Sequence, residues 1–145
     1  MKRIATVDQG NGSAKFTLWE LEHGGVRMAR RRRSSRDQWS APAGLAFVHE
    51  WSPDALAISS VAGEAARTEL AQLLSTHVRG PLLEHLGAGL DNRTRTPETV
   101  GEDRLFAARG ALELVGRSAV IVDAGTALTV DALCVGSSGE RAAFL

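Results

Sequence analysis

Short apolar runs separated by turn residues fill the first third of the chain. Residues 4–8, 14–21 and about 26–33 have the length and the composition of strands. Glycine-rich turns at residues 10–12 and 24–25 separate these runs. The pattern therefore predicts a three-stranded meander at the start of the chain.

The middle of the chain combines an apolar run with a helical pattern. Residues 55–61 are typical of a buried strand. Across residues 63–77, apolar side chains recur at spacings of three and four, which predicts a helix with one buried face. The spaced positions are Ala66, Leu70, Leu73 and Leu74. Weaker patterns predict a short helix within residues 42–51, a short strand at 82–86 and a polar loop at 91–97.

The last third begins with the strongest helical pattern in the sequence. Residues 99–115 carry one apolar stripe, and Gly116 is a suitable helix stop. The stripe consists of Leu105, Ala108, Leu112 and Val115. A buried strand is predicted at 119–123, a second strand at 128–135 and a third at 140–145. Together these elements predict an α/β protein.

Composition narrows the class of protein. A chain of 145 residues with 43% apolar residues suits one domain, or one and a fraction, and excludes general disorder. Lys plus Arg and Asp plus Glu both number 17, and this balance argues against a dedicated nucleic-acid binder. No apolar run approaches the roughly 18 residues of a membrane span, and no secretory signal is visible. We expect a cytoplasmic protein with no nucleic-acid or membrane partner.

Two strand–turn segments carry an Asp directly after an apolar run. They are residues 7–11 (VDQGN) and 122–126 (VDAGT). A glycine in such a turn lets backbone N–H groups approach a phosphate, and Asp8 is suited to a hydrated divalent cation. Asn11, Ser13 and Lys15 add donors. Each segment alone is equally well read as an ordinary hairpin, but two of them in one short chain favour nucleotide binding.

The start of the strongest helix carries the segment Gly101-Glu102-Asp103-Arg104. A helix N-terminus favours anions, and an Arg fork pairs well with a carboxylate. Asp103 is suited to accept a proton from a substrate hydroxyl. Acidic residues are also favourable in the first turn of any helix, and the spacing alone favours that interpretation.

Three segments in this order resemble the type III pantothenate kinases, which belong to the superfamily of acetate kinase, sugar kinases, heat-shock proteins and actin. Residues 8–15 (DQGNGSAK) resemble the first phosphate loop of the family, D-x-G-N-[ST]-x-x-K. Residues 97–104 (PETVGEDR) resemble its pantothenate segment, P-E-x-[VL]-G-x-D-R. Residues 122–131 (VDAGTALTVD) resemble its second phosphate loop. Residues 58–61 (ISSV) are a fainter match.

The resemblance implies a fold and an activity. It implies a ribonuclease-H-like (actin-like ATPase) domain at residues 1–116, with a mixed sheet flanked by helices. Residues 117–145 would be the opening hairpin of a second such domain. The implied reaction is the ATP-dependent phosphorylation of pantothenate to 4′-phosphopantothenate, the first step of coenzyme A biosynthesis, in a homodimer.

The resemblance also implies roles for individual residues. Asp103 would be the catalytic base, and Gly101, Glu102, Asp103 and Arg104 would bind pantothenate. Asp123 would hold the potassium or ammonium ion, and Asp8 would lie near magnesium. ATP would be bound by Asp8, Gln9, Gly10, Asn11, Gly12, Ser13, Ala14, Lys15 and Thr126.

The sequence departs from the family pattern at several points. Gly12 stands where the family usually has Thr or Ser, and the chain contains no Tyr, although the family commonly places one against pantothenate. By the resemblance, the second domain would end after its first strands. Two alternatives therefore stay open: a catalytically incomplete chain that only binds partners, or another small-molecule kinase of the same superfamily.

Three further features have ordinary interpretations. Six arginines form a cationic cluster between residues 27 and 36, for which a solvated strand end is favoured over a site for nucleic acid or an acidic partner. Cys134, the single cysteine, excludes an internal disulfide and is expected to be a small buried residue. Trp19, Trp39 and Trp51 are expected in the core or in an interface.

Overall fold

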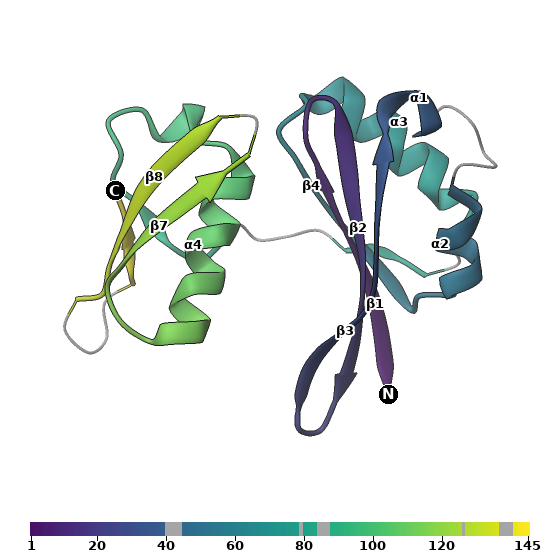
Figure 1. Cartoon of the computed structure of the whole chain (residues 1–145), viewed down its shortest axis with the longest axis horizontal. Coiled ribbons are helices and arrows are strands. Elements are labelled where there is room, and N and C mark those ends of the chain that lie inside the picture. The colour runs from purple at the N-terminus through teal and green to yellow at the C-terminus, as the bar shows by residue number, and fades with distance from the viewer. Residues whose placement is uncertain (40–44, 79, 84–87, 126, 137–140) are drawn as a thin grey trace. The chain divides into compact units, whose positions relative to one another are not determined.

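The chain folds into two compact units, Met1–Glu84 and His85–Leu145. Figure 1 shows the computed structural model, which describes residues 1–39, 45–78, 80–83, 88–125, 127–136 and 141–145. The units are groups of residues that pack together. The division at residue 116 predicted from the sequence concerns the domains of the whole protein, and it stays a prediction.

Unit 1 is built on a mixed five-stranded sheet of order β3-β2-β1-β4-β5. The predicted meander is confirmed, because β1 (Lys2–Gln9), β2 (Ser13–Glu22) and β3 (Gly25–Ser35) pair antiparallel. Two later strands, β4 (Ala55–Ser60) and β5 (Leu82–Leu83), extend the sheet in parallel from β1. Strand β1 is therefore central, and its carboxyl end leads directly into the turn at residues 10–12.

The helices of unit 1 pack into a single core with one face of this sheet. They are α1 (Arg36–Trp39), α2 (Ala46–Trp51) and α3 (Glu64–Ser75), and each contributes to the buried cluster. The rings of Phe16 and Phe47 meet edge to face, with centroids 5.2 Å apart. The predicted positions Ala66, Leu70 and Leu74 of α3 are buried, and Leu70 and Leu74 belong to this core. The side chains that alternate with the core positions on β1 and β2 point to the other face of the sheet.

Unit 2 has a four-stranded sheet of order β6-β9-β8-β7 and one long helix. The strands are β6 (Asp91–Asn92), β7 (Ala119–Ala124), β8 (Leu128–Cys134) and β9 (Ala143–Phe144). A short 3-10 turn, η2 (Pro97–Thr99), precedes α4 (Glu102–Val115), which packs against β7 and β8. Gly116 ends the helix in the left-handed conformation with φ 63°, and its N–H donates to Leu112 O at 2.8 Å. The predicted stop is confirmed.

Some expectations for unit 2 are wrong. Residues 91–92, predicted as part of a loop, form β6, and helix α4 begins at residue 102 because residues 97–99 take the tighter 3-10 turn. Strand β7 is not buried: Val120 and Val122 are 69% and 61% exposed. Cys134, expected in the core, is exposed, because its position on β8 alternates with the buried Leu133.

None of the described helices is long and apolar enough to cross a membrane.

Candidate nucleotide and substrate site

The first predicted phosphate loop is the tight turn between β1 and β2. The Gly10 N–H donates to Ser13 O at 2.9 Å, which closes the turn. Asp8 and Lys15 are direct cross-strand partners, and Lys15 Nζ lies 3.0 Å from Asp8 Oδ2. Both side chains are about half exposed, at 47% for Asp8 and 48% for Lys15. A carboxylate and an ammonium group are thus accessible side by side at the mouth of the turn.

Burial separates the predicted loop residues into two groups. Gln9 and Ala14 are fully buried, and the Gln9 amide Nε2 donates to Ala66 O at 3.1 Å. Asn11 and Gly12 are exposed, and Ser13 is half-buried. The side chains available to a ligand here are therefore Asn11, Ser13 and the Asp8–Lys15 pair. Gln9 and Ala14 offer only backbone groups.

The second predicted segment begins helix α4. Gly101 is the extended N-cap residue, and the N–H groups of Arg104 and Leu105 donate to its carbonyl oxygen at 3.2 and 3.4 Å. Asp103 is half-buried, and its Oδ1 accepts a hydrogen bond of 2.8 Å from the Arg104 N–H. This bond orients the carboxyl group of Asp103.

Arg104 is paired within the protein. Its Nε donates to both carboxylate oxygens of Asp131, at 3.1 and 3.2 Å, and its Nη2 also donates to Asp131 Oδ1. The Asp131 side chain is 2% exposed and that of Arg104 33%. The hydrogen bonds from Asp131 raise the pKa of Arg104 above its already high ordinary value. The guanidinium also lies over the Phe144 ring, 5.7 Å from its centroid.

Asp131 is the residue that sequence reasoning missed. It is the last residue of the segment 122–131, which resembles the second phosphate loop, but the resemblance implied no role for it. A signal was present in the strand alternation of β8, where Asp131 shares its inward-facing side with the buried Leu133. A charged residue at an inward-facing position needs a partner, because burying an unpaired charge is costly. The partner, Arg104, is 27 residues away in sequence.

The third predicted segment is the β7–β8 hairpin. Asp123 faces Thr129 across the hairpin and is exposed. The Gly125 N–H donates to Ala127 O at 3.1 Å and closes the turn. The predicted ATP contact Thr126 lies outside the described residues. Thr129 Oγ1 is buried and has no hydrogen-bond partner among the described residues.

The structure groups these residues by unit. Residues 8–15 lie in unit 1, whereas Asp103, Arg104, Asp123 and Asp131 lie in unit 2. No group of three or more His, Cys, Asp or Glu side chains in the described part of the chain has the spacing of a metal centre. The predicted cation sites therefore each rest on a single carboxylate, Asp8 or Asp123.

The fold is shared with solved structures of the Ppx/GppA protein family. A crystal structure of the Aquifex aeolicus member of the Ppx/GppA protein family superposes with a TM-score of 0.55 at 13% identity, over 99% of this chain and 51% of that one. The type II variant of the Aquifex aeolicus Ppx/GppA phosphatase also gives a TM-score of 0.55, at 11% identity, over 100% of this chain and 52% of that one. At these identities the likeness concerns the fold alone.

Sequence comparison assigns the family within that fold. The profile of the type III pantothenate kinase family matches residues 4–140, and the chain belongs to this family. Type III pantothenate kinases of Dechloromonas aromatica and Thermobifida fusca are each 32% identical, over 90% and 94% of this chain. The matches span 54% and 56% of those relatives, so the chain spans about half the length of the curated relatives it matches.

Proposed function

We propose that the protein transfers the γ-phosphoryl group of ATP to the primary hydroxyl of pantothenate, yielding 4′-phosphopantothenate and ADP. The observation that carries this proposal is the family match across residues 4–140, which includes all three predicted binding segments. The reaction is the first step of coenzyme A biosynthesis. We place it in the cytoplasm, where ATP is available.

The phosphate groups of ATP would be held at the β1–β2 turn. Lys15 would neutralise phosphate charge, and Asn11 and Ser13 would donate hydrogen bonds. Phosphoryl transfer needs mainly positioning and charge neutralisation, which these accessible groups are suited to supply. The exposure of Asp8 beside Lys15 supports this assignment, because both charges are open to a ligand.

Pantothenate would bind at the start of α4, along Gly101, Glu102, Asp103 and Arg104. Asp103 would take the proton of the primary hydroxyl of pantothenate. The hydroxyl oxygen would form a bond to the γ-phosphorus of ATP while the bond from that phosphorus to the β–γ bridging oxygen breaks, so that ADP leaves. Asp131 occupies Nε and Nη2 of Arg104 and leaves Nη1 for the substrate carboxylate. The orientation of the Asp103 carboxyl by the Arg104 N–H supports the role of the base.

Two cations are implied by this reaction. Magnesium is commonly held by one or two carboxylates together with substrate phosphates, and the half-exposed Asp8 fits such a site. Magnesium would neutralise charge on the transferred phosphoryl group. Asp123 is exposed at the carboxyl end of β7 and offers an oxygen ligand to potassium or ammonium.

The proposed architecture extends beyond one mixed sheet. We assign residues 1–116, which include the five-stranded sheet of unit 1, to a ribonuclease-H-like domain, because a central β1 with antiparallel and parallel neighbours suits that fold. The β7–β8 hairpin would open a second domain of the same kind. We further propose a homodimer, as the family resemblance implies.

A coupled assay of ADP release tests the function. The purified 145-residue chain is incubated with ATP, magnesium and potassium, with and without pantothenate, and the product is identified by mass. Pantothenate-dependent ADP release with formation of phosphopantothenate is the expected result. A folded chain that binds ATP but forms no phosphopantothenate would instead support the second candidate, a catalytically incomplete binding chain.

A further inference from the structure

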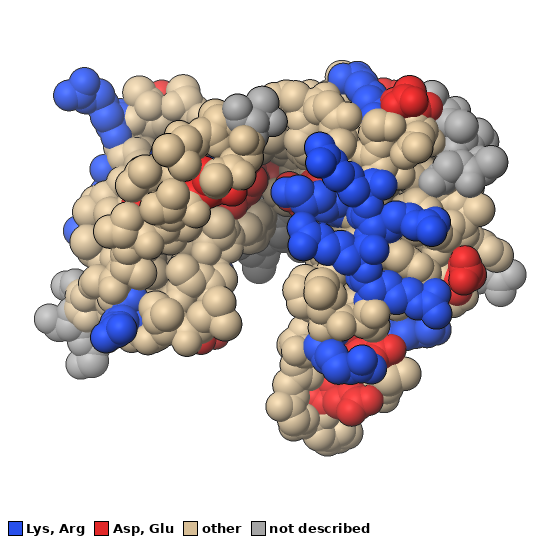
Figure 2. All heavy atoms as spheres, in the orientation of Figure 1, with Lys and Arg blue, Asp and Glu red and all other residues tan. Residues whose placement is uncertain are grey.

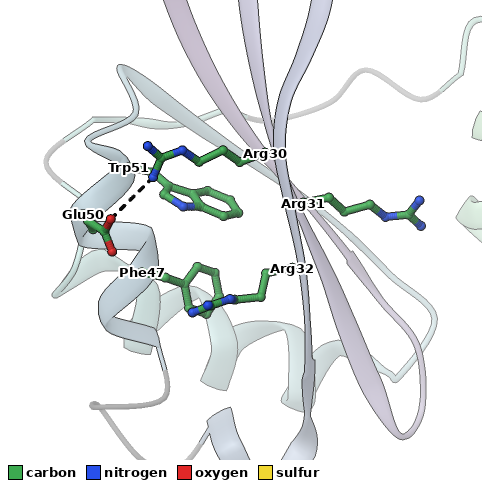
Figure 3. Close-up of a pocket in the computed structure, with 6 residues that line it drawn as sticks. All are labelled: Arg30, Arg31, Arg32, Phe47, Glu50 and Trp51. Carbon is green, nitrogen blue, oxygen red and sulfur yellow. Dashed lines mark hydrogen bonds and ion pairs between the residues drawn. The ribbon is translucent and has the colours of Figure 1, made fainter.

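Strand β3 carries a run of arginines that the proposed function does not use. In the β2–β3 register, Arg30 and Arg32 lie opposite Leu18 and Phe16, whereas Arg31 lies opposite Thr17. Cross-strand partners project to the same face of a sheet, so consecutive arginines point to opposite faces. Figure 3 shows this division: Arg30 and Arg32 extend toward helix α2, and Arg31 extends from the other side of the strand.

The arginines on the helix side are satisfied within the protein. The Arg32 guanidinium lies 5.1 Å from the centroid of the Phe47 ring, and Arg30 Nη1 lies 3.5 Å from Glu50 Oε1. Near the far end of the strand, Arg27 pairs with Glu20. A pocket of about 320 Å³ lies here, lined by Arg30, Arg31, Arg32, Phe47, Glu50 and Trp51. Two of its three cations, Arg30 and Arg32, are already engaged by a carboxylate and by an aromatic ring, so the pocket carries no ligand proposal.

The arginines on the other side lie beside the predicted phosphate loop. Arg33 is the direct cross-strand partner of Lys15, and Arg33 Nε donates to Ser13 Oγ at 3.0 Å. Arg31 is two residues away on the same face, about 7 Å along the strand. Both arginines are exposed, and within the described part of the chain neither forms an ion pair with a carboxylate.

This side of the sheet carries an excess of positive charge. Lys15 is compensated by Asp8, but Arg31 and Arg33 add two cations without a matching carboxylate in the described region. Figure 2 shows Lys and Arg side chains gathering into a continuous patch on one face of unit 1. Such a patch attracts anions, and the planar fork of Arg suits phosphate oxygens.

We propose that Arg33 and Arg31 extend the loop of residues 10–15 into a binding site for a polyphosphate chain. The hydrogen bond from Arg33 Nε to Ser13 Oγ orients the guanidinium, and it leaves Nη1 and Nη2 of Arg33 for phosphate oxygens. Arg31, two residues along the same face, would contact the next phosphate group of the polyphosphate. The inference rests on the proposed function only for the identity of the nucleotide, since any linear polyphosphate has the required chemistry.

The experiment measures binding of inorganic tripolyphosphate, and then of Mg·ATP, by isothermal titration calorimetry on the full 145-residue chain. The test variants are Arg33→Gln and the double variant R31Q/R33Q. The matched control is R27Q/R30Q, which removes two charges from the same strand where each arginine has a carboxylate partner. Tryptophan fluorescence checks that each variant is folded, because all three Trp residues lie in unit 1.

We expect Arg33→Gln to weaken tripolyphosphate binding about tenfold, and R31Q/R33Q to weaken it further, while the control changes it less than about threefold. Arg33→Lys keeps the charge but lacks the fork and should recover part of the affinity. The proposal is overturned if the unmodified chain does not bind tripolyphosphate, or if R27Q/R30Q weakens binding as much as R31Q/R33Q.

The two proposals fail in distinguishable ways. If tripolyphosphate binding depends on Arg33 but the chain forms no phosphopantothenate, the proposed anion site is supported and the proposed activity of this chain is contradicted. Formation of phosphopantothenate with equal rates and equal ATP affinity in the unmodified chain and in R31Q/R33Q would keep the activity and reject the anion site.

Discussion

The Arg104 guanidinium forms a two-point hydrogen-bonded pair with the buried carboxylate of Asp131. The pair joins the first turn of α4 to β8, and so it links the predicted pantothenate segment to the strand that follows the second phosphate loop. Because Asp131 satisfies one edge of the guanidinium, the direction of the remaining donors is set by the fold. The orientation of the Arg104 side chain is therefore fixed by its pairing with Asp131.

Replacing Asp131 with Asn should destabilise unit 2. The change removes the negative partner of a guanidinium that is only one-third exposed, and we expect a loss of about 1–3 kcal/mol in the free energy of unfolding. Urea unfolding followed by circular dichroism measures it. The control Glu113→Gln breaks the exposed Arg109–Glu113 pair and should cost less than about 0.5 kcal/mol. Equal effects of the two variants would contradict the structural role of Asp131.

Replacing Asp103 with Asn should abolish the proposed reaction while sparing nucleotide binding. The amide cannot accept the hydroxyl proton, so pantothenate-dependent ADP release should fall by about 100-fold or more. Calorimetry should find that the variant binds Mg·ATP with an affinity within about twofold of that of the unmodified chain. Glu113→Gln, an exposed change near the other end of α4 and outside the predicted pantothenate segment, is the control. Unchanged turnover in Asp103→Asn would remove this residue from the role of the base.

Replacing Asp123 with Ala should remove a dependence on monovalent cations. If Asp123 holds potassium or ammonium, phosphopantothenate formation by the unmodified chain should rise when either ion replaces sodium. The variant should respond equally to all three ions, because its oxygen ligand is gone. Rates are compared at constant ionic strength. An unmodified chain that is indifferent to the cation would contradict the assignment.

Replacing Gly12 with Ser should strengthen ATP binding. Gly12 is exposed, and a Cβ built there meets no atom within 4 Å, so a side chain fits without rearrangement. The new hydroxyl would restore the donor that the family usually carries at this position. We expect Mg·ATP to bind about threefold more tightly, as one added hydrogen bond would give. Weaker binding in Gly12→Ser would argue against phosphate contact at this turn.

Replacing Gly80 with Ala should destabilise unit 1. A Cβ at Gly80 would lie 2.3 Å from the Asp54 carbonyl oxygen and 2.9 Å from Ala55 N, both backbone atoms. The clash would displace Gly80 and Pro81, which precede β5. It would disturb the hydrogen bond of 3.0 Å from the Leu56 N–H to Pro81 O. We expect a loss of about 1–3 kcal/mol, measured by tryptophan fluorescence in urea. Gly24→Ala, in open space at the β2–β3 turn, is the control and should be nearly neutral.

Local pattern predicted the long elements well. The strand run at residues 4–8 identifies a strand. The spacing of Ala66, Leu70 and Leu74 identifies a helix and its buried face, because side-chain periodicity follows directly from backbone geometry. The ordered binding segments likewise indicated the family, which the profile match confirms.

One short element and the exposure of a strand were beyond local pattern. Strand β6 has two residues, was predicted as part of a loop, and exists because it pairs with β9. Strand β7 has the apolar composition of a core strand, yet Val120 and Val122 are exposed, because exposure depends on what packs against a strand.

The sequence by itself determined the longer strands, the longer helices and the family, since each depends mainly on patterns of residues that are close along the chain. Only the tertiary structure decided how charges are paired. It placed Asp131 against Arg104 across 27 residues, and it divided the β3 arginines into a compensated and an uncompensated face. The physical reason is that an ion pair depends on distance in space and on burial, and strand pairing sets both.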